Sequence, residues 1–182
     1  YPLEEGSLNI RFKQNLHRGC RQWCPELNTI QDYADIAAAT QAVYERVFEH
    51  LVKTLKNKTG QDNLVIMGGC ALNCVANNIA LDYFKNVWVM PNPGDAGSSL
   101  GAVLADHKDF IEWPGPYLGY NIKGRYPISA ALKELQTTGL VGVANGRAEF
   151  GPRALGNRSL LADPRGPDMK DKVNTVKRRQ EF

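Results

Sequence analysis

The chain has 182 residues, 43% of them hydrophobic, and a formal net charge of +3, which allows one large domain or two small ones. No window approaches the run of about 20 apolar residues that a membrane-spanning helix needs, and the N-terminus lacks the basic-then-apolar layout of a signal peptide. We therefore expect a cytoplasmic protein without a membrane partner. The four cysteines are too few for a disulfide-stapled scaffold at this length, so reduced thiols are expected.

The predicted elements alternate between helices and strands. Apolar residues recur every fourth position over 33–58, which predicts one long amphipathic helix, with Asp32 as its N-cap and Gly60 at its end. A short apolar run at 63–67 is typical of a strand buried on both faces. A helix over 71–83, a strand at 87–90 and a small-residue helix over 97–106 follow. This order indicates an α/β layer architecture.

Breaker residues divide the chain further along. A segment rich in proline and glycine begins at residue 113 and predicts a linker. Beyond it, a helix over 128–137 and a strand at 140–144 lead into an arginine-rich block. We therefore expect four regions: an N-terminal arm or insertion at 1–30, an α/β domain at 31–112, a linker at 113–121 and the start of a second domain at 122–182.

Two glycine-rich loops follow the two predicted strands of the first domain. Gly68 and Gly69 come after the first strand, and glycine can bring main chain against a nucleotide, although any tight strand-to-helix turn also uses it. The loop after the second strand places Asp95 between glycines, just before a helix. Ligands gather at the carboxyl ends of strands in open α/β sheets. We expect Asp95 to hold a divalent cation, with a helix cap as the alternative.

A block rich in arginine and glycine occupies residues 146–165. Guanidinium groups bind phosphate or carboxylate through two parallel hydrogen bonds, and the block holds two acids, Glu149 and Asp163, against four arginines. No helical face with interleaved aromatics carries these arginines, so we expect a small phosphorylated substrate and no nucleic acid. A salt-bridge network, in which the two acids pair with Arg153 or Arg158, is the alternative. The candidate substrate-binding residues are Arg147, Arg153, Arg158 and Ser159.

Two groups of cysteines need an explanation. His17, Cys20 and Cys24 suggest zinc, because thiolate and imidazole ligands at such spacings can close a tetrahedral site. No nearby motif supplies a fourth ligand, so ordinary packing is the preferred interpretation. The same interpretation applies to Cys70 and Cys74.

The chain resembles the NodU/CmcH-type O-carbamoyltransferases, which place carbamoyl groups on hydroxyls of natural products. Three motifs carry the resemblance over residues 35–182: GGCALNCVAN, PNPGDAGSSLGA and GRAEFGPRALGNRSLLADPR. The resemblance implies the second half of an actin/sugar-kinase-like ATPase domain, followed by the beginning of a YrdC-like α/β domain. It also implies that carbamoyl phosphate and ATP give carbamoyl adenylate in the YrdC-like domain. The carbamoyl group would then move to a small-molecule acceptor at a metal site of the first domain.

The resemblance also implies roles for individual residues. Gly68, Gly69 and Asn73 would line the adenosine nucleotide, and Asp95 would bind iron or magnesium. The candidate residues of the arginine block would contact the phosphate or carbamoyl group. No catalytic residue is assigned.

The family's metal site also uses a pair of histidines on one helix of an earlier half-domain, and no such pair occurs among His17, His50 and His107. We therefore expect a middle piece, truncated at both ends and inactive alone, whose partners are the remaining parts of its own polypeptide. The sequence also allows a homo-oligomer. Two alternatives stay open: a threonylcarbamoyl transferase acting on tRNA, against which the block around Arg153 argues, and a nucleotide-binding fragment without turnover.

Overall fold

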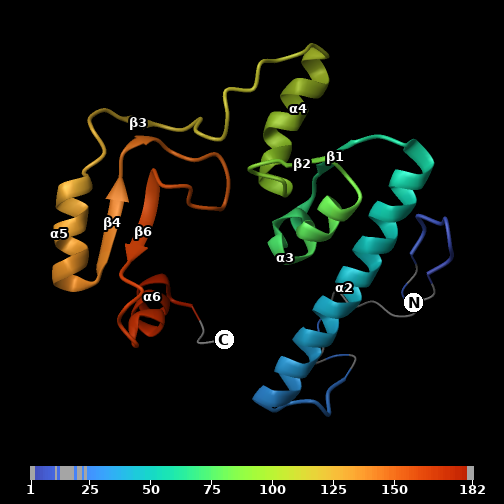
Figure 1. Ribbon diagram of the computed structural model, residues 1–182, viewed down its shortest axis with the longest axis horizontal. Coiled ribbons are helices and arrows are strands. Elements are labelled where there is room, and N and C mark those ends of the chain that lie inside the picture. Colours follow the sequence, from blue (N-terminus) through green and yellow to red (C-terminus); the bar gives the residue numbers. More distant parts are fainter. Residues whose placement is uncertain (1–2, 11, 13–18, 20–21, 23, 180–182) are drawn as a thin grey trace. The chain divides into compact units, whose positions relative to one another are not determined.

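The computed structural model describes residues 3–10, 12, 19, 22 and 24–179. The chain divides into two compact units, Tyr1–Met90 and Pro91–Phe182. In the described residues, the six strands form three two-stranded sheets, and helices lie between them along the chain (Figure 1). This mixture confirms the expected α/β class. None of the described helices is both long enough and apolar enough to cross a membrane.

The first unit is built around the 30-residue helix α2, Ile30–Thr59. Thr29 is its N-cap: the Thr29 hydroxyl accepts from the Asp32 N–H at 3.1 Å, and the Asp32 carboxylate accepts from the Thr29 N–H at 2.9 Å. The two residues thus form a capping box. The prediction that Asp32 is the N-cap is wrong, because it occupies the third helical position. Gly60 ends the helix with a φ of 64°, as predicted.

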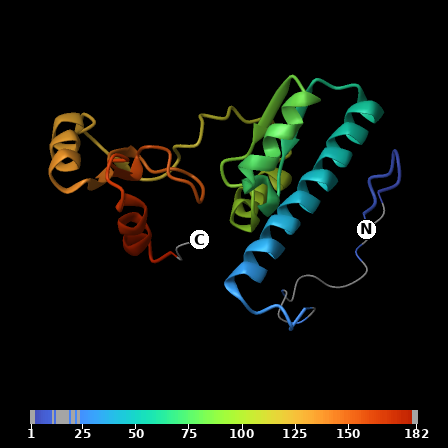
Figure 2. The same cartoon turned by 60° about the horizontal axis from the view of Figure 1, so that its bottom comes forward.

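A small parallel sheet lies beside α2 (Figure 2). Its strands are β1, Asn63–Ile66, and β2, Asn86–Val89. One face of the sheet packs on α2, but Val65 is 58% exposed and Trp88 is 43% exposed. The prediction that the first strand is buried on both faces is therefore wrong, because the described residues cover one face. One buried hydrophobic cluster of this unit consists of Val52, Leu64, Ala80 and Phe84.

The segment between the two strands is broken into three short pieces, so the single helix predicted over 71–83 is wrong. A 3-10 turn, η2, spans Gly69–Leu72; the helix α3 spans Cys74–Asn77; and a second 3-10 turn, η3, spans Asn78–Asp82. Asn73 separates the first two pieces with a non-helical ψ of 83°. Asparagine side chains bond to nearby main chain and so compete with helix continuation.

The second unit begins with a 3-10 turn, η4, at Asp95–Gly97, followed by the helix α4, Ser98–His107. The position of α4 agrees with the predicted helix over 97–106. Residues 108–120 form neither helix nor strand. The limits of the four predicted regions stay predictions.

The rest of the second unit combines two antiparallel sheets with two helices. The helix α5, Ile128–Thr138, ends at Gly139 and leads into β4, Leu140–Ala144, and both elements agree with the prediction. Strand β4 pairs with β6, Arg158–Ala162, in a five-residue register. The short strands β3, Asn121–Ile122, and β5, Gly146–Arg147, form the second sheet. A last helix, α6, spans Met169–Lys177.

Candidate functional site

The glycine turn after β1 leaves open space next to its main chain. Gly68 has a φ of 95° and precedes η2, and Gly69 is the first residue of η2. Both glycines are exposed, and an added Cβ at either position meets no heavy atom within 4 Å. Only Gly68 has a backbone conformation that disfavours other residues. The absence of a side chain at Gly69 is therefore not required by packing within the described chain.

Asn73, the third predicted nucleotide residue, is held by hydrogen bonds within the first unit. Its side-chain oxygen accepts from the Ala76 N–H at 3.3 Å, which caps α3. Its amide also exchanges two hydrogen bonds with the Gln41 amide of α2, at 2.9 and 3.3 Å. Asn73 thus fixes the glycine-turn segment to the long helix, a role that the sequence did not indicate.

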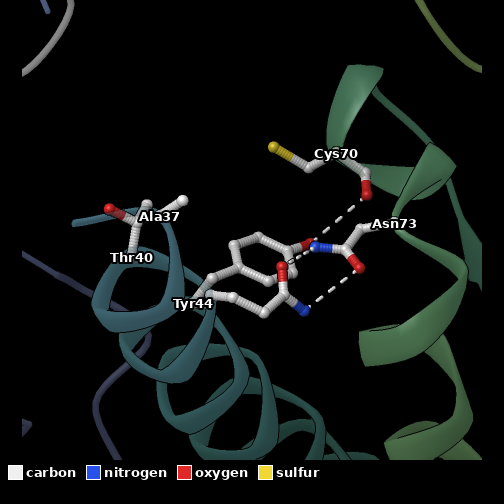
Figure 3. A pocket seen from close by; sticks show the side chains of 6 residues that line it. Ala37, Thr40, Tyr44, Cys70 and Asn73 are labelled. Carbon is white, nitrogen blue, oxygen red and sulfur yellow. Dashed lines mark hydrogen bonds between the residues drawn. The ribbon is translucent and has the colours of Figure 1, made fainter. Parts of the chain in front are cut away.

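A pocket of about 380 Å³ opens between α2 and this segment (Figure 3). The Tyr44 hydroxyl donates to the Cys70 carbonyl at 3.4 Å. Partial burial raises the pKa of the Tyr44 phenol, and the neighbouring Cys70 thiol adds to the rise. The pocket includes Asn73 but neither of the two glycines. It is lined by Ala37, Thr40, Gln41, Tyr44, Cys70 and Asn73.

The helix residues of this pocket were not among the predicted site residues. Positions 37, 40, 41 and 44 follow one another at helical spacing, so they share one face of α2. That spacing was the available signal. A polar stripe on a long helix usually faces solvent, so this spacing alone does not indicate a pocket. The structure shows the pocket because it places the glycine turn against α2.

The cysteines give no metal site in the described part of the chain. Cys70 and Cys74 are both exposed, so the interpretation that they are packed is wrong for this structure. His17 and Cys20, two of the three residues of the zinc interpretation, lie outside the described residues. Among the residues that are described, no group of three His, Cys, Asp or Glu side chains could hold a metal ion.

Asp95 is exposed at the start of η4, and its side chain caps neither η4 nor α4. The carboxylate makes no hydrogen bond or ion pair with any residue that the structure describes. The loop around it is tight, because a Cβ on Gly97 would overlap the Asn92 carbonyl. Asp95 is therefore a free carboxylate on a fixed loop. This carboxylate can supply one oxygen ligand to a hard cation.

Arg158 is bound to main chain within its own unit. Its Nη1 donates to the carbonyls of Asn145 and Asn157, both at 2.8 Å, and its Nη2 donates to the Tyr120 carbonyl at 3.0 Å. Both nitrogens also lie 3.3–3.4 Å from the Gly146 carbonyl. These contacts favour a bracing role for this guanidinium and leave less of it for a substrate.

Glu149 accepts hydrogen bonds from the main chain that follows it. One oxygen, Oε1, accepts the N–H groups of Leu155 at 2.9 Å, Asn157 at 2.8 Å and Arg158 at 3.1 Å. Partial burial acts to raise the pKa of Glu149. The N–H groups of Leu155, Glu149 itself, Arg158 and Asn157 outweigh it and lower the pKa to about 2. This carboxylate is thus ionised throughout the physiological range.

The salt-bridge network that was the alternative interpretation does not have its expected pairs. Asp163 pairs with Arg165 at 2.6 Å. The hydrogen bond from the Arg165 side chain is the main cause that lowers the pKa of Asp163 to about 2. Neither acid pairs with Arg153 or Arg158 among the described residues.

Two of the four candidate substrate residues, both arginines, keep a guanidinium group without a partner in the described chain. The guanidinium groups of Arg147 and Arg153 are exposed and make no hydrogen bond or ion pair within the described chain. The Ser159 hydroxyl oxygen accepts from the Gly156 N–H at 2.9 Å, so it serves the loop and retains only its own O–H as a donor.

The structure brings two of the three sequence motifs together in the second unit. A Cβ on Gly151 would overlap the Pro91 carbonyl and approach Asn92. The main chain of the arginine block therefore lies against the loop that leads to Asp95. The glycine turn and Asn73 belong to the first unit.

The comparisons with known proteins match both units. The family model described as Carbamoyltransferase N-terminus matches residues 7–104, which include the glycine turn and Asp95. The model described as Carbamoyltransferase C-terminus matches residues 132–182, which include the arginine block. The motifs that carried the resemblance thus fall within the two matched segments.

Known relatives match most of the chain. It is 33% identical to nodulation protein NolO of Bradyrhizobium diazoefficiens, over 83% of this chain and 33% of that protein. It is 42% identical to nodulation protein U of Rhizobium tropici, over 68% of this chain and 24% of that protein. It is 34% identical to an uncharacterized protein of Synechocystis, over 90% of this chain and 32% of that protein. The chain thus spans about a third or less of the length of these relatives.

Proposed function

Since the chain belongs to the carbamoyltransferase family, we propose that it forms part of an O-carbamoyltransferase that uses ATP and carbamoyl phosphate. The observation that carries the proposal is the pair of exposed guanidinium groups, Arg147 and Arg153, in a block whose acids are already bound elsewhere. Glu149 is bound to main chain and Asp163 to Arg165. A substrate phosphate would neutralise the free positive charge.

The proposed reaction has two stages. Carbamoyl phosphate, ATP and one water give carbamoyl adenylate, phosphate and pyrophosphate. A hydroxyl oxygen of a small-molecule acceptor then attacks the carbamoyl carbon, and AMP leaves. In the first stage, Arg153 and Arg147 bind the phosphate of carbamoyl phosphate, with Arg158 and Ser159 holding the loop beside it.

The first unit would supply a nucleotide-binding surface. Gly68 and Gly69 leave the space that an adenine nucleotide needs for close approach to main chain, and Asn73 borders the pocket against α2. Its amide is shared with Gln41, so Asn73 would have to exchange this partner to bond the nucleotide directly. We also propose that the first domain has an actin/sugar-kinase-like fold and that the second has a YrdC-like fold.

Asp95 would contribute one oxygen to a divalent cation, iron or magnesium, whose remaining ligands come from outside the described residues. When bound, this cation would polarise the carbamoyl carbonyl or a phosphate oxygen. The free carboxylate of Asp95 fits such a role. We further propose that the protein acts in the cytoplasm and that its partners are the acceptor and the remainder of its own polypeptide.

The test is pyrophosphate release that depends on carbamoyl phosphate, measured in a complete enzyme containing this chain. Arg153→Lys keeps the charge but removes the bidentate fork, and we expect it to lower the release rate about tenfold at subsaturating carbamoyl phosphate. Arg165→Lys makes the same chemical change at a residue paired with Asp163 and should leave the rate unchanged. An Arg153→Lys enzyme with the wild-type rate and substrate dependence would contradict the assignment.

A further inference from the structure

The arginine loop, defined as residues 150–157, is fixed at both ends. At its start, the Phe150 N–H donates to the Pro116 carbonyl at 2.6 Å, and Gly151 lies against the main chain of Pro91. At its end, the main chain of residues 155–157 forms hydrogen bonds with side chains. Arg153 lies between these ends, with its guanidinium exposed. The exposed residue Arg153 therefore lies on a short segment whose two ends are held by contacts with the rest of the unit.

The end of the loop satisfies its main-chain groups with side chains from outside it. The N–H groups of Leu155 and Asn157 donate to Glu149, and the Gly156 N–H donates to Ser159. The carbonyls of Leu155 and Gly156 accept from the hydroxyls of Tyr117 at 3.0 Å and Tyr126 at 3.3 Å. Glu149 is the one charged acceptor in this set, and a single oxygen of it accepts from the N–H groups of Leu155, Asn157 and Arg158.

We propose that Glu149 is a positioning residue, which orders the arginine loop and thereby presents the Arg153 guanidinium to a phosphate-bearing substrate. The inference rests on the proposed role of Arg153. Its physical basis is entropic: a loop with glycine, proline and alanine around Arg153 loses conformational freedom when it binds an anion, unless that freedom is already lost. The three N–H groups on Glu149 fix the loop before the substrate arrives.

The charge of Glu149 makes this role distinguishable from a direct electrostatic one. A carboxylate near an anion site repels the anion, so removing the charge alone would strengthen anion binding. Positioning predicts the opposite result. Glu149→Gln keeps one acceptor oxygen and nearly the same shape, but it replaces charge-assisted hydrogen bonds with neutral ones, which are about half as strong.

The experiment measures two quantities on a complete enzyme that contains this chain: calorimetric affinity for carbamoyl phosphate, and hydrogen exchange of the loop amides. For Glu149→Gln we expect the exchange of the Leu155, Asn157 and Arg158 amides to rise about tenfold and the affinity to fall at least about fivefold. The matched control is Asp163→Asn, which also removes one carboxylate from the block and should leave the loop amides and the affinity unchanged or slightly raise the affinity.

The outcomes separate the positioning role from the function on which it rests. Glu149→Gln with wild-type or tighter affinity overturns the positioning role, provided that Arg153→Lys weakens binding in the same assay. If the complete wild-type enzyme binds no carbamoyl phosphate, or if Arg153→Lys binds as wild type does, the anion site itself is wrong and its positioning falls with it. Should Glu149→Gln fail to fold, Glu149→Asp keeps the charge but retracts the oxygen. Wild-type affinity for Glu149→Asp would then overturn the positioning role.

Discussion

The Arg158 guanidinium should stabilise the second unit, and replacing it with lysine tests this directly. The group donates to carbonyls at 2.8–3.0 Å from three segments, those of Tyr120, Asn145 and Asn157. A lysine ammonium is a single point of charge and cannot span these carbonyls. Each hydrogen bond from a charged donor contributes about 1.5–3 kcal/mol. Water and the lysine ammonium replace some of the lost hydrogen bonds at this half-exposed site. We therefore expect Arg158→Lys to lower the free energy of unfolding of the second unit by about 2 kcal/mol.

The measurement is native-state hydrogen exchange of the β4–β6 ladder, which reports on the second unit independently of the first. A loss of about 2 kcal/mol raises the opening equilibrium about 30-fold, so the amides of Val143 and Ser159 should exchange faster by that factor. Arg153→Lys makes the same chemical change at a residue without described partners, and it should change these rates by about twofold or less. If Arg158→Lys exchanges within about threefold of wild type, the bracing role of Arg158 is wrong.

Three further predictions follow from the site geometry. The folded pKa of Glu149, about 2, lies below its ordinary value of 4.5, so its contribution to stability is complete above pH 4.5 and is lost as the pH falls toward 2. The amide chemical shift of Leu155 should titrate with a midpoint near pH 2, and a midpoint near 4.5 would contradict the hydrogen bonds to Glu149. Gly69→Val should weaken ATP binding about tenfold in calorimetry while circular dichroism stays normal, because the added Cβ at Gly69 meets open space; unchanged ATP affinity would remove Gly69 from the nucleotide site. Asp95→Ala should lower metal content and carbamoyl transfer in the complete enzyme, and survival of both would leave Asp95 outside the metal site.

Local patterns in the sequence predicted some of the helices and strands, because those patterns act within a few residues. The four-residue apolar repeat and Gly60 predicted the body and end of α2. The N-cap was assigned to Asp32 because Thr29 and Asp32, the two members of the capping box, are both residue types that cap helices. Only the backbone conformation shows that Thr29 is the N-cap. Likewise, an apolar run predicted β1 but could not predict which face of the strand remains exposed, since Val65 depends on what the rest of the fold covers.

The roles of individual side chains in the arginine block depended on contacts between distant residues. Arg158 donates to the Tyr120 carbonyl, 38 positions earlier in the chain. A count of arginines and acids in the sequence therefore could not predict which guanidinium binds main chain and which remains free. The pairing of Asp163 with Arg165, two positions away, was open to prediction from spacing. Glu149 would pair with an arginine only in the alternative salt-bridge network. Its main-chain partners exist only because the loop turns back onto it.

We propose that this chain belongs to an enzyme that activates carbamoyl phosphate with ATP. Exchange of radiolabelled pyrophosphate into ATP tests it most directly, in a complete enzyme that contains the chain, because carbamoyl adenylate formation releases pyrophosphate and its reversal returns the label. We predict exchange that requires carbamoyl phosphate and falls about tenfold in Arg153→Lys. Exchange that is absent, or that requires threonine and bicarbonate in place of carbamoyl phosphate, would contradict the claim.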